Sequence, residues 1–152
     1  MTLRNLLAIL IIERSNFQVL HWKVKGHHFD NMHAKVTNDY YETISTDIDD
    51  VAEMCMRLGL NPLSYTDAYR IAKTTHPNIL IVSAESDYSR DQTISMIDAI
   101  LKTILQVIEG VLYSDEIQNE RTNVGIKACL EGLYDKYDKE YRFLNERRKV
   151  VD

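Results

Sequence analysis

Apolar side chains recur every three or four positions along most of this chain, which is the spacing of one face of an α-helix. The first such segment covers residues 3–24; only Glu13 interrupts its apolar face, and Gly26 is expected to end the helix. The second covers residues 30–58, with Gly59 as its stop. At 1.5 Å per residue the second helix would be roughly 40 Å long, a length typical of an elongated helical bundle.

The second half of the chain predicts three further helices. Residues 66–73 predict a short helix capped by its first threonine, and residues 74–86 predict a connection. A third long helix is expected to begin near Asp87 and to end between positions 113 and 120. The last long helix is expected to begin at position 122 or 123, so the pattern predicts four long helices in all.

The connection between the second and third long helices is too long for a simple turn. About 27 residues separate them, whereas antiparallel neighbours need only a few. The chain must therefore cross from one end of the bundle to the other, with the short helix on the outside. The predicted fold is an all-α, ferritin-like four-helix bundle with a long crossover carrying a short extra helix between helices 2 and 3. Exposed apolar residues on that crossover would bind a partner subunit.

Composition supports one helical domain over residues 1–152. The 152 residues, 45% of them apolar, suffice for one buried core, and five glycines and two prolines favour long helices. No apolar run approaches the ~20 residues of a membrane-spanning helix, and Glu13 ends the apolar opening early, so a soluble, cytoplasmic protein is expected. Cys55 and Cys129 are predicted to be buried, reduced thiols.

The candidate chemistry lies around the break between the first two helices. His21 and His33 are twelve positions apart across this break, although a single histidine near an apolar face is more often a core or surface residue. Asp49 and Glu53 stand at i and i+4, so their carboxylates project from one helix face. Imidazole and carboxylate together suit Fe(II) and related divalent metals and leave coordination positions open for an oxidant.

An ordinary surface is the alternative for the two carboxylates. Asp47, Asp49 and Asp50 would form an acidic, solvated stripe on the second helix. On the residues alone, this alternative is the stronger one for Asp49 and Glu53.

A resemblance to a known family changes that weighting. The segments that carry it are His21-Trp22, Gly26, Phe29 to His33, Asp49-Asp50-Val51-Ala52-Glu53, Leu58-Gly59, Pro62, Thr66 and Tyr69. On these segments the chain resembles the Dps family (DNA-binding protein from starved cells) of the ferritin-like superfamily. The resemblance is close in the first half and weaker over the third helix and residues 134–148.

The resemblance implies a homododecameric shell with iron-oxidation sites between two-fold-related subunits. One subunit would supply His21 and His33 to each site. Its partner would supply Asp49 and Glu53. Such a ferroxidase, an oxidoreductase acting on iron (Fe2+/Fe3+), uses peroxide or oxygen, stores ferric mineral and limits oxidative stress. Trp22 would lie beside the site and be oxidised in place of the ligands, or else serve as an interface anchor.

Two features depart from the family pattern. Thr37 occupies a position, one turn after His33, where many relatives carry an additional aspartate. Sixteen positions lead from His33 to Asp49, one more than the family spacing, and one extra residue rotates a regular helix by about 100°. If both ends keep their family positions, a π-bulge between Ala34 and Ile48 should absorb the extra residue.

Charge argues against strong binding to DNA. The formal net charge is −5, and Arg147-Arg148-Lys149 is a short basic cluster. Because the first helix is expected to start within a few residues of Met1, we expect no Lys/Arg-rich tail of the kind on which the family commonly relies. Because affinity for DNA depends on neutralising phosphates, little affinity is expected at physiological salt.

Three functions therefore compete. The leading hypothesis is an iron-binding ferroxidase and iron-storage shell. The second is a Dps-like structural or binding assembly with weak or lost ferroxidase activity, suggested by Thr37 and by the extra residue. The third is a monomeric helical bundle with an unrelated partner.

Overall fold

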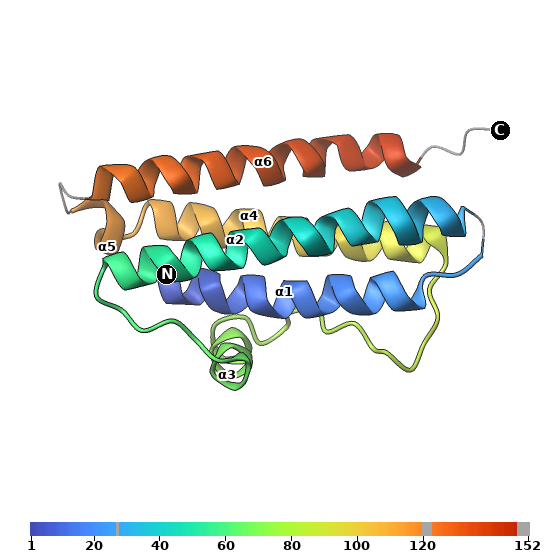
Figure 1. Cartoon of the computed structure of the whole chain (residues 1–152), viewed down its shortest axis with the longest axis horizontal. Helices are drawn as coiled ribbons and strands as arrows, with labels where there is room; N and C mark the ends of the chain where they lie inside the picture. Colours follow the sequence, from blue (N-terminus) through green and yellow to red (C-terminus); the bar gives the residue numbers. More distant parts are fainter. Residues whose placement is uncertain (27, 120–122, 149–152) are drawn as a thin grey trace.

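Four long helices lie side by side along one axis in the computed structural model, which describes residues 1–26, 28–119 and 123–148 (Figure 1). Position 122, one of the two predicted helix starts, and Lys149 lie outside this part of the chain, as do the side chains of Arg147 and Arg148. The elements are α1 (Leu3–Lys23), η1 (Asn31–Thr37), α2 (Asn38–Arg57), α3 (Tyr65–Thr75), α4 (Arg90–Leu112), α5 (Asp115–Gln118) and α6 (Val124–Arg148). The predicted all-α bundle is confirmed, and α5 is an additional single turn.

The apolar stripes predicted for the four long helices form the core. Every predicted stripe residue of α1 and α4 is buried. On α6, Tyr141 is partly exposed, and the other predicted stripe residues are buried, namely Ile126, Leu130, Leu133, Tyr137 and Leu144. Burying one large aliphatic or aromatic side chain stabilises the fold by roughly 1.5–3 kcal/mol, so the shared core drives the assembly of the bundle. The fully buried residues of the stripes of α1 and α4 are Leu3, Leu6, Leu10, Phe17, Leu20, Val24, Ile94, Ile97, Leu101, Ile104, Ile108 and Val111.

The two cysteines differ in environment. Cys55 is buried as predicted, and burial raises the pKa of its thiol to about 11. Cys129 is exposed, so the prediction that it is buried is wrong. It directly precedes the buried Leu130 on α6, which places it beside the core face of the helix and not on it.

Side-chain caps set two helix starts that differ from the predicted ones. The side chain of Ser64, not Thr66, accepts the hydrogen bond that begins α3. Helix α4 begins at Arg90 because Ser89 and Gln92 form a capping box, in which each side chain bonds the other's backbone N–H. Asp87, the predicted start, instead pairs with Lys23 at 2.9 Å.

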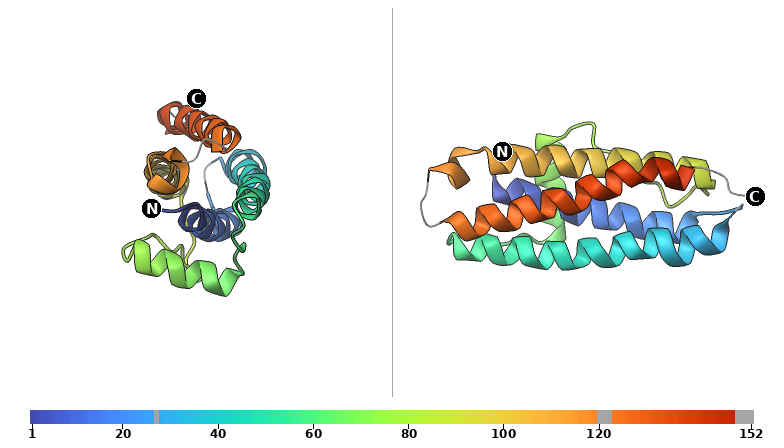
Figure 2. Two further views of the ribbon diagram at one scale, coloured as in Figure 1. Left: turned by 90° about the vertical axis from the view of Figure 1, so that its left-hand side faces the viewer. Right: turned by 90° about the horizontal axis from the view of Figure 1, so that it is seen from above.

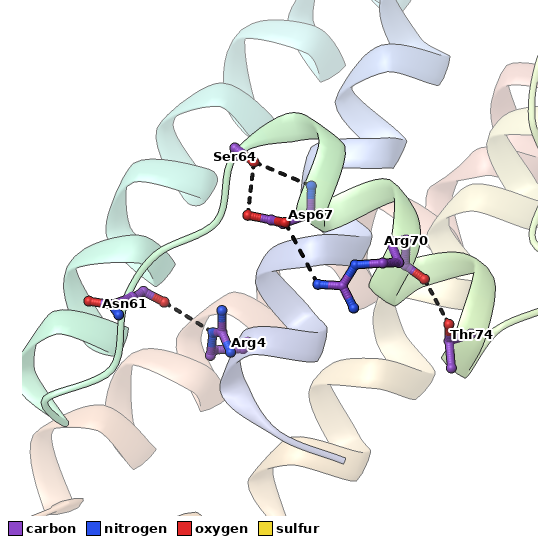
Figure 3. A network of polar contacts seen from close by, with 6 residues as sticks. All are labelled: Arg4, Asn61, Ser64, Asp67, Arg70 and Thr74. Carbon is purple, nitrogen blue, oxygen red and sulfur yellow. Dashed lines mark hydrogen bonds and ion pairs between the residues drawn. The ribbon is translucent and has the colours of Figure 1, made fainter.

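The crossover between α2 and α4 carries α3 across the outside of α1 (Figures 1 and 2). Ala68 and Ala72 are the buried residues of α3, and their small side chains allow the helix to approach α1 closely. Arg4 of α1 donates a hydrogen bond from Nε to the carbonyl of Asn61 at 3.1 Å, just before the Ser64 cap (Figure 3). The predicted outside position of the short helix is confirmed.

The crossover ends at the opposite end of the bundle, where it is clamped to the end of α1. Lys25 donates its backbone N–H to the carbonyl of Tyr88 at 2.8 Å, and Tyr88 donates to the carbonyl of Lys23 at 2.9 Å. This short parallel bridge holds the start of α4 beside the last turn of α1. His21 lies in that same turn, so these backbone hydrogen bonds hold the segment that carries His21 against the crossover.

Several aromatic side chains remain exposed on the outside of the bundle. Tyr65 and Tyr69 of α3 are 55% and 44% exposed, and Trp22 of α1 is 56% exposed. Among the described helices, none combines the length and the apolar character that a membrane span requires.

Candidate metal centre

The two candidate histidines lie face to face. His21 lies in the last turn of α1 and His33 in η1, and their ring centroids are 4.0 Å apart with an angle of 13° between the ring planes. The ring of Phe29 stacks on His33 from its own segment, at 5.0 Å and 17°. The sequence predicted only that both histidines lie beside the same helix break. It did not predict that their rings stack or that Phe29 joins the stack, because both depend on the path of the chain through that break.

The segment that carries His33 is π-helical from Asn31 to Thr37. A wide turn of this kind takes up one residue more than an α-helical turn, and it is often found at functional sites. The predicted window ran from Ala34 to Ile48. The observed segment begins three residues before this window, and only residues 34–37 lie inside it. The predicted π feature is therefore present, displaced toward His33.

Reciprocal hydrogen bonds fix the orientation of both rings. Nδ1 of His21 lies 2.8 Å from the carbonyl oxygen of His33, and Nδ1 of His33 lies 2.7 Å from the carbonyl oxygen of His21. A carbonyl oxygen only accepts, so each neutral ring must carry its proton on Nδ1. The Nε2 atom of each ring is then left with a free lone pair, which is the form in which histidine binds a metal.

The surroundings of His21 favour its neutral form. Burial lowers the pKa of His21, the neighbouring His33 lowers it further, and the hydrogen bond to the His33 carbonyl acts in the opposite direction. A neutral imidazole at neutral pH keeps its Nε2 lone pair available to a cation.

The two candidate carboxylates lie elsewhere on the same chain. Asp49 and Glu53 are exposed on α2, one turn apart as predicted. Sixteen helical positions separate Asp49 from His33, which corresponds to roughly 20 Å or more along the helix. One chain therefore does not bring the four groups together, and the described residues contain no cluster of three or more metal-binding side chains.

Asp47 does not belong to a solvated stripe with Asp49 and Asp50, so that prediction is wrong for Asp47. Its side chain is buried, Tyr137 donates a hydrogen bond to Oδ2 at 2.6 Å, and Lys136 of α6 pairs with Oδ1. Asp47 faces α6 because it falls on the same side of α2 as the buried residues Ile44 and Val51. It joins two helices and is not a candidate ligand.

A groove of about 360 Å³ runs between α2 and α6 beside this ion pair. Glu53, Arg57 and Cys129 line it, whereas Asp49 does not. Both signs of charge are present in the groove, so it does not by itself form a cation site.

Comparisons with known proteins were made on both sequence and structure. No protein-family model matches the chain. The "DNA protection during starvation protein" of Helicobacter pylori (strain J99) is 42% identical over 55 residues, which are 36% of this chain. That match spans only 35% of the relative's own length.

Solved structures match over almost the whole chain. The Dps of Staphylococcus aureus superposes with a TM-score of 0.81 at 19% identity, covering 98% of this chain and 93% of that one. A Dps protein of Vibrio cholerae O1, described as a member of a broad superfamily of ferritin-like diiron-carboxylate proteins, gives 0.81 at 23% identity, covering 97% and 86%. At these identities the structural likeness concerns the fold.

Proposed function

We propose that this chain, which has the Dps-type, ferritin-like fold and resembles a Dps protein in part of its sequence, is one subunit of an iron-oxidising and iron-storing shell. The proposal depends on one observation: Nδ1 of each of the two imidazoles is hydrogen-bonded to a backbone carbonyl oxygen. Two rings with free Nε2 atoms at one place are a half-site for a divalent cation such as Fe(II).

The missing half of the site is proposed to come from a second copy of the chain. His21 and His33 of one subunit would bind Fe(II), and Asp49 and Glu53 of a two-fold partner would complete the coordination. The carboxylates would neutralise part of the charge of the cation. A two-fold interface contains two identical sites, so each subunit would give both halves.

The chemistry requires electrons to pass from the bound substrate to an oxidant. Peroxide accepts two electrons, so two Fe(II) ions become Fe(III) while two protons are consumed and two water molecules form. Dioxygen is the alternative oxidant. Ferric product would pass to the interior of the shell and be stored there.

Two aromatic residues next to the histidines have proposed supporting roles. Phe29 covers the ring of His33 and would keep water away from it. Trp22 follows His21 directly and is exposed, so its indole would either anchor the subunit interface or be oxidised in place of the ligands.

Anaerobic loading with Fe(II), followed by peroxide, tests the activity through the ultraviolet absorbance of the ferric product. The wild type should oxidise Fe(II) much faster than the double variant His33→Ala, Glu53→Ala. His76→Ala, a change at a histidine of the crossover, is the matched control and should behave as the wild type. Equal rates in the wild type and the double variant would contradict the proposal.

Mixed shells test the sharing of the site between subunits. One variant lacks both histidines (His21→Ala, His33→Ala) and the other lacks both carboxylates (Asp49→Ala, Glu53→Ala), so neither shell alone should be active. In shells assembled from equal amounts of both, about a quarter of the sites are intact, because each mixed two-fold pair contains one intact site. Activity near a quarter of the wild type is expected, and none at all would exclude shared sites.

A Dps-like assembly with weak or lost ferroxidase activity is the second candidate. Thr37 favours it, because a hydroxyl cannot supply the charge of the additional aspartate found in many relatives. Shells that remain intact on a sizing column but neither bind nor oxidise Fe(II) would support this candidate.

A further inference from the structure

Thr37 lies at the end of the π-helical segment with its side chain completely buried. Its hydroxyl oxygen is 2.8 Å from the carbonyl oxygen of Met32 and 3.1 Å from that of His33. It is also 3.2 Å from Nδ1 of His21, on the neighbouring helix. One hydroxyl therefore contacts both the turn that carries one histidine and the ring of the other.

The direction of these hydrogen bonds follows from their partners. Both carbonyl oxygens only accept, so the Thr37 hydroxyl must donate its proton to one of them. Its lone pairs remain free to accept a hydrogen bond from Nδ1–H of His21. The carbonyl oxygen of His33 accepts from the same N–H. The His21 proton is thus shared between two acceptors on the same segment, and a rotation of the ring would lose both contacts.

The hydroxyl also supports the wide turn itself. Its bond to Met32 spans five positions, the same span as the backbone hydrogen bond of a π-helix. An extra side-chain bond over this span stabilises a conformation that is rare in proteins. The carbonyl of His33, which orients His21, belongs to this turn.

We propose that Thr37 is a positioning residue for the histidine pair. Its hydroxyl holds the ring of His21 directly and binds the carbonyl of His33, so that Nδ1–H of His21 is directed to the backbone and Nε2 is available to a cation. This inference rests on the proposed function in one respect only, which is that His21 and His33 bind a cation. Thr37 brings no charge, so the half-site of this chain is neutral and its counter-charge must come from the partner's carboxylates.

The test compares Thr37→Val, which keeps the shape and removes the hydroxyl, with Thr37→Ser, which keeps the hydroxyl. Thr93→Val is the matched control, because Thr93 is equally buried and its hydroxyl has no hydrogen-bond partner among the described residues. Nitrogen-15 spectra of the imidazole rings of the metal-free protein report which ring nitrogen carries the proton. Titration with Co(II), followed by its visible absorption, reports cation binding.

The wild type, Thr37→Ser and Thr93→Val should each show His21 protonated on Nδ1. Thr37→Val should populate both forms of His21 and bind Co(II) about tenfold more weakly, the lower end of the range for losing a group that orients a ligand. Unchanged spectra and unchanged Co(II) affinity in Thr37→Val would overturn the inference. So would a wild type whose His21 carries its proton on Nε2, a result that does not depend on any variant folding.

Failure of the proposed function gives a different pattern. In that case the wild-type shell binds neither Co(II) nor Fe(II), while the spectra of His21 still change between Thr37→Ser and Thr37→Val.

Discussion

At the scale of single residues, Glu13 is the position where the apolar pattern of α1 breaks, and the structure buries it completely. Oε2 is 3.4 Å from the side-chain nitrogen of Asn16, and Oε1 has no hydrogen-bond partner among the described residues. Asn16 in turn holds the crossover through Leu80 and Val82, at 2.9 Å each. Burial raises the pKa of Glu13 from 4.5 to about 8, so its carboxyl is largely protonated at neutral pH.

The pH dependence of stability follows from this shift. The folded pKa lies above the unfolded value, so the unfolded chain releases the proton first, and stability falls as the pH rises from about 4.5 to about 8. At 1.36 kcal/mol per unit the loss amounts to about 5 kcal/mol at most. Glu13→Gln should abolish this part of the slope and be more stable than the wild type at pH 8.

Urea unfolding at pH 5 and at pH 8 measures the effect of Glu13. Glu109→Gln, at an exposed position of α4, is the control and should keep the wild-type slope. Parallel pH profiles of Glu13→Gln and the wild type would show that Glu13 is ionised in the fold.

Asp47 is the buried acid that does have partners. Asp47→Ala would leave the buried hydroxyl of Tyr137 without its acceptor and Lys136 without its counter-charge. We expect the free energy of unfolding to fall by about 3 kcal/mol. Asp50→Ala, at the exposed neighbouring position, should change it by less than about 0.5 kcal/mol. Denaturant unfolding of both variants checks the difference, and equal effects would contradict the role assigned to Asp47.

At the scale of elements, the sequence predicted the existence of the long helices and of the crossover better than their limits. Apolar spacing of three and four determines which faces meet, and these faces are the buried ones. The start of α3 depends on competition between two nearby hydroxyls, whereas α4 begins after its capping residue Ser89, and Asp87 pairs instead with Lys23. Ser64 takes the cap of α3 from Thr66 because its backbone is extended and its side chain reaches the N–H of Asp67.

For the candidate site, too, the sequence predicted that a feature is present but not where it lies. Counting residues between His33 and Asp49 predicts that one residue must be absorbed, but it does not say where. The location depends on contacts that no spacing encodes, namely the two bonds between Nδ1 atoms and carbonyl oxygens and the hydroxyl of Thr37. These contacts place the wide turn around His33, overlapping only the first residues of the predicted window.

Deleting one residue should test whether η1 absorbs the extra position. Removal of the exposed Ala34 should convert the wide turn into an α-helical turn, leave α2 in register and change the free energy of unfolding by about 1 kcal/mol or less. Removal of the exposed Gln106 from the regular helix α4 should rotate one half of its apolar face by about 100° and prevent folding. Circular dichroism and urea unfolding distinguish these outcomes, and an unfolded Ala34 deletion would contradict the interpretation.

At the scale of the whole molecule, the outside of the bundle carries aromatic side chains that a single chain leaves in water. Tyr69 lies on α3, the helix that crosses α1. Tyr69→Asp should leave the stability of the subunit within about 0.5 kcal/mol, because the side chain is exposed, and should shift a shell toward smaller species. Analytical ultracentrifugation measures this shift. An assembly of unchanged size would exclude this face as a subunit contact.

The stacked rings of His21 and His33 are oriented within a single chain, which bears on how the proposed shell would assemble. Three hydrogen-bond contacts that orient the two imidazoles lie within this chain, between the end of α1 and η1. If the chain forms the proposed shell, each subunit would therefore hold its two imidazoles in this orientation before it meets another copy. In the proposed shell, the partner's carboxylates would then meet a pair of imidazoles that is already oriented.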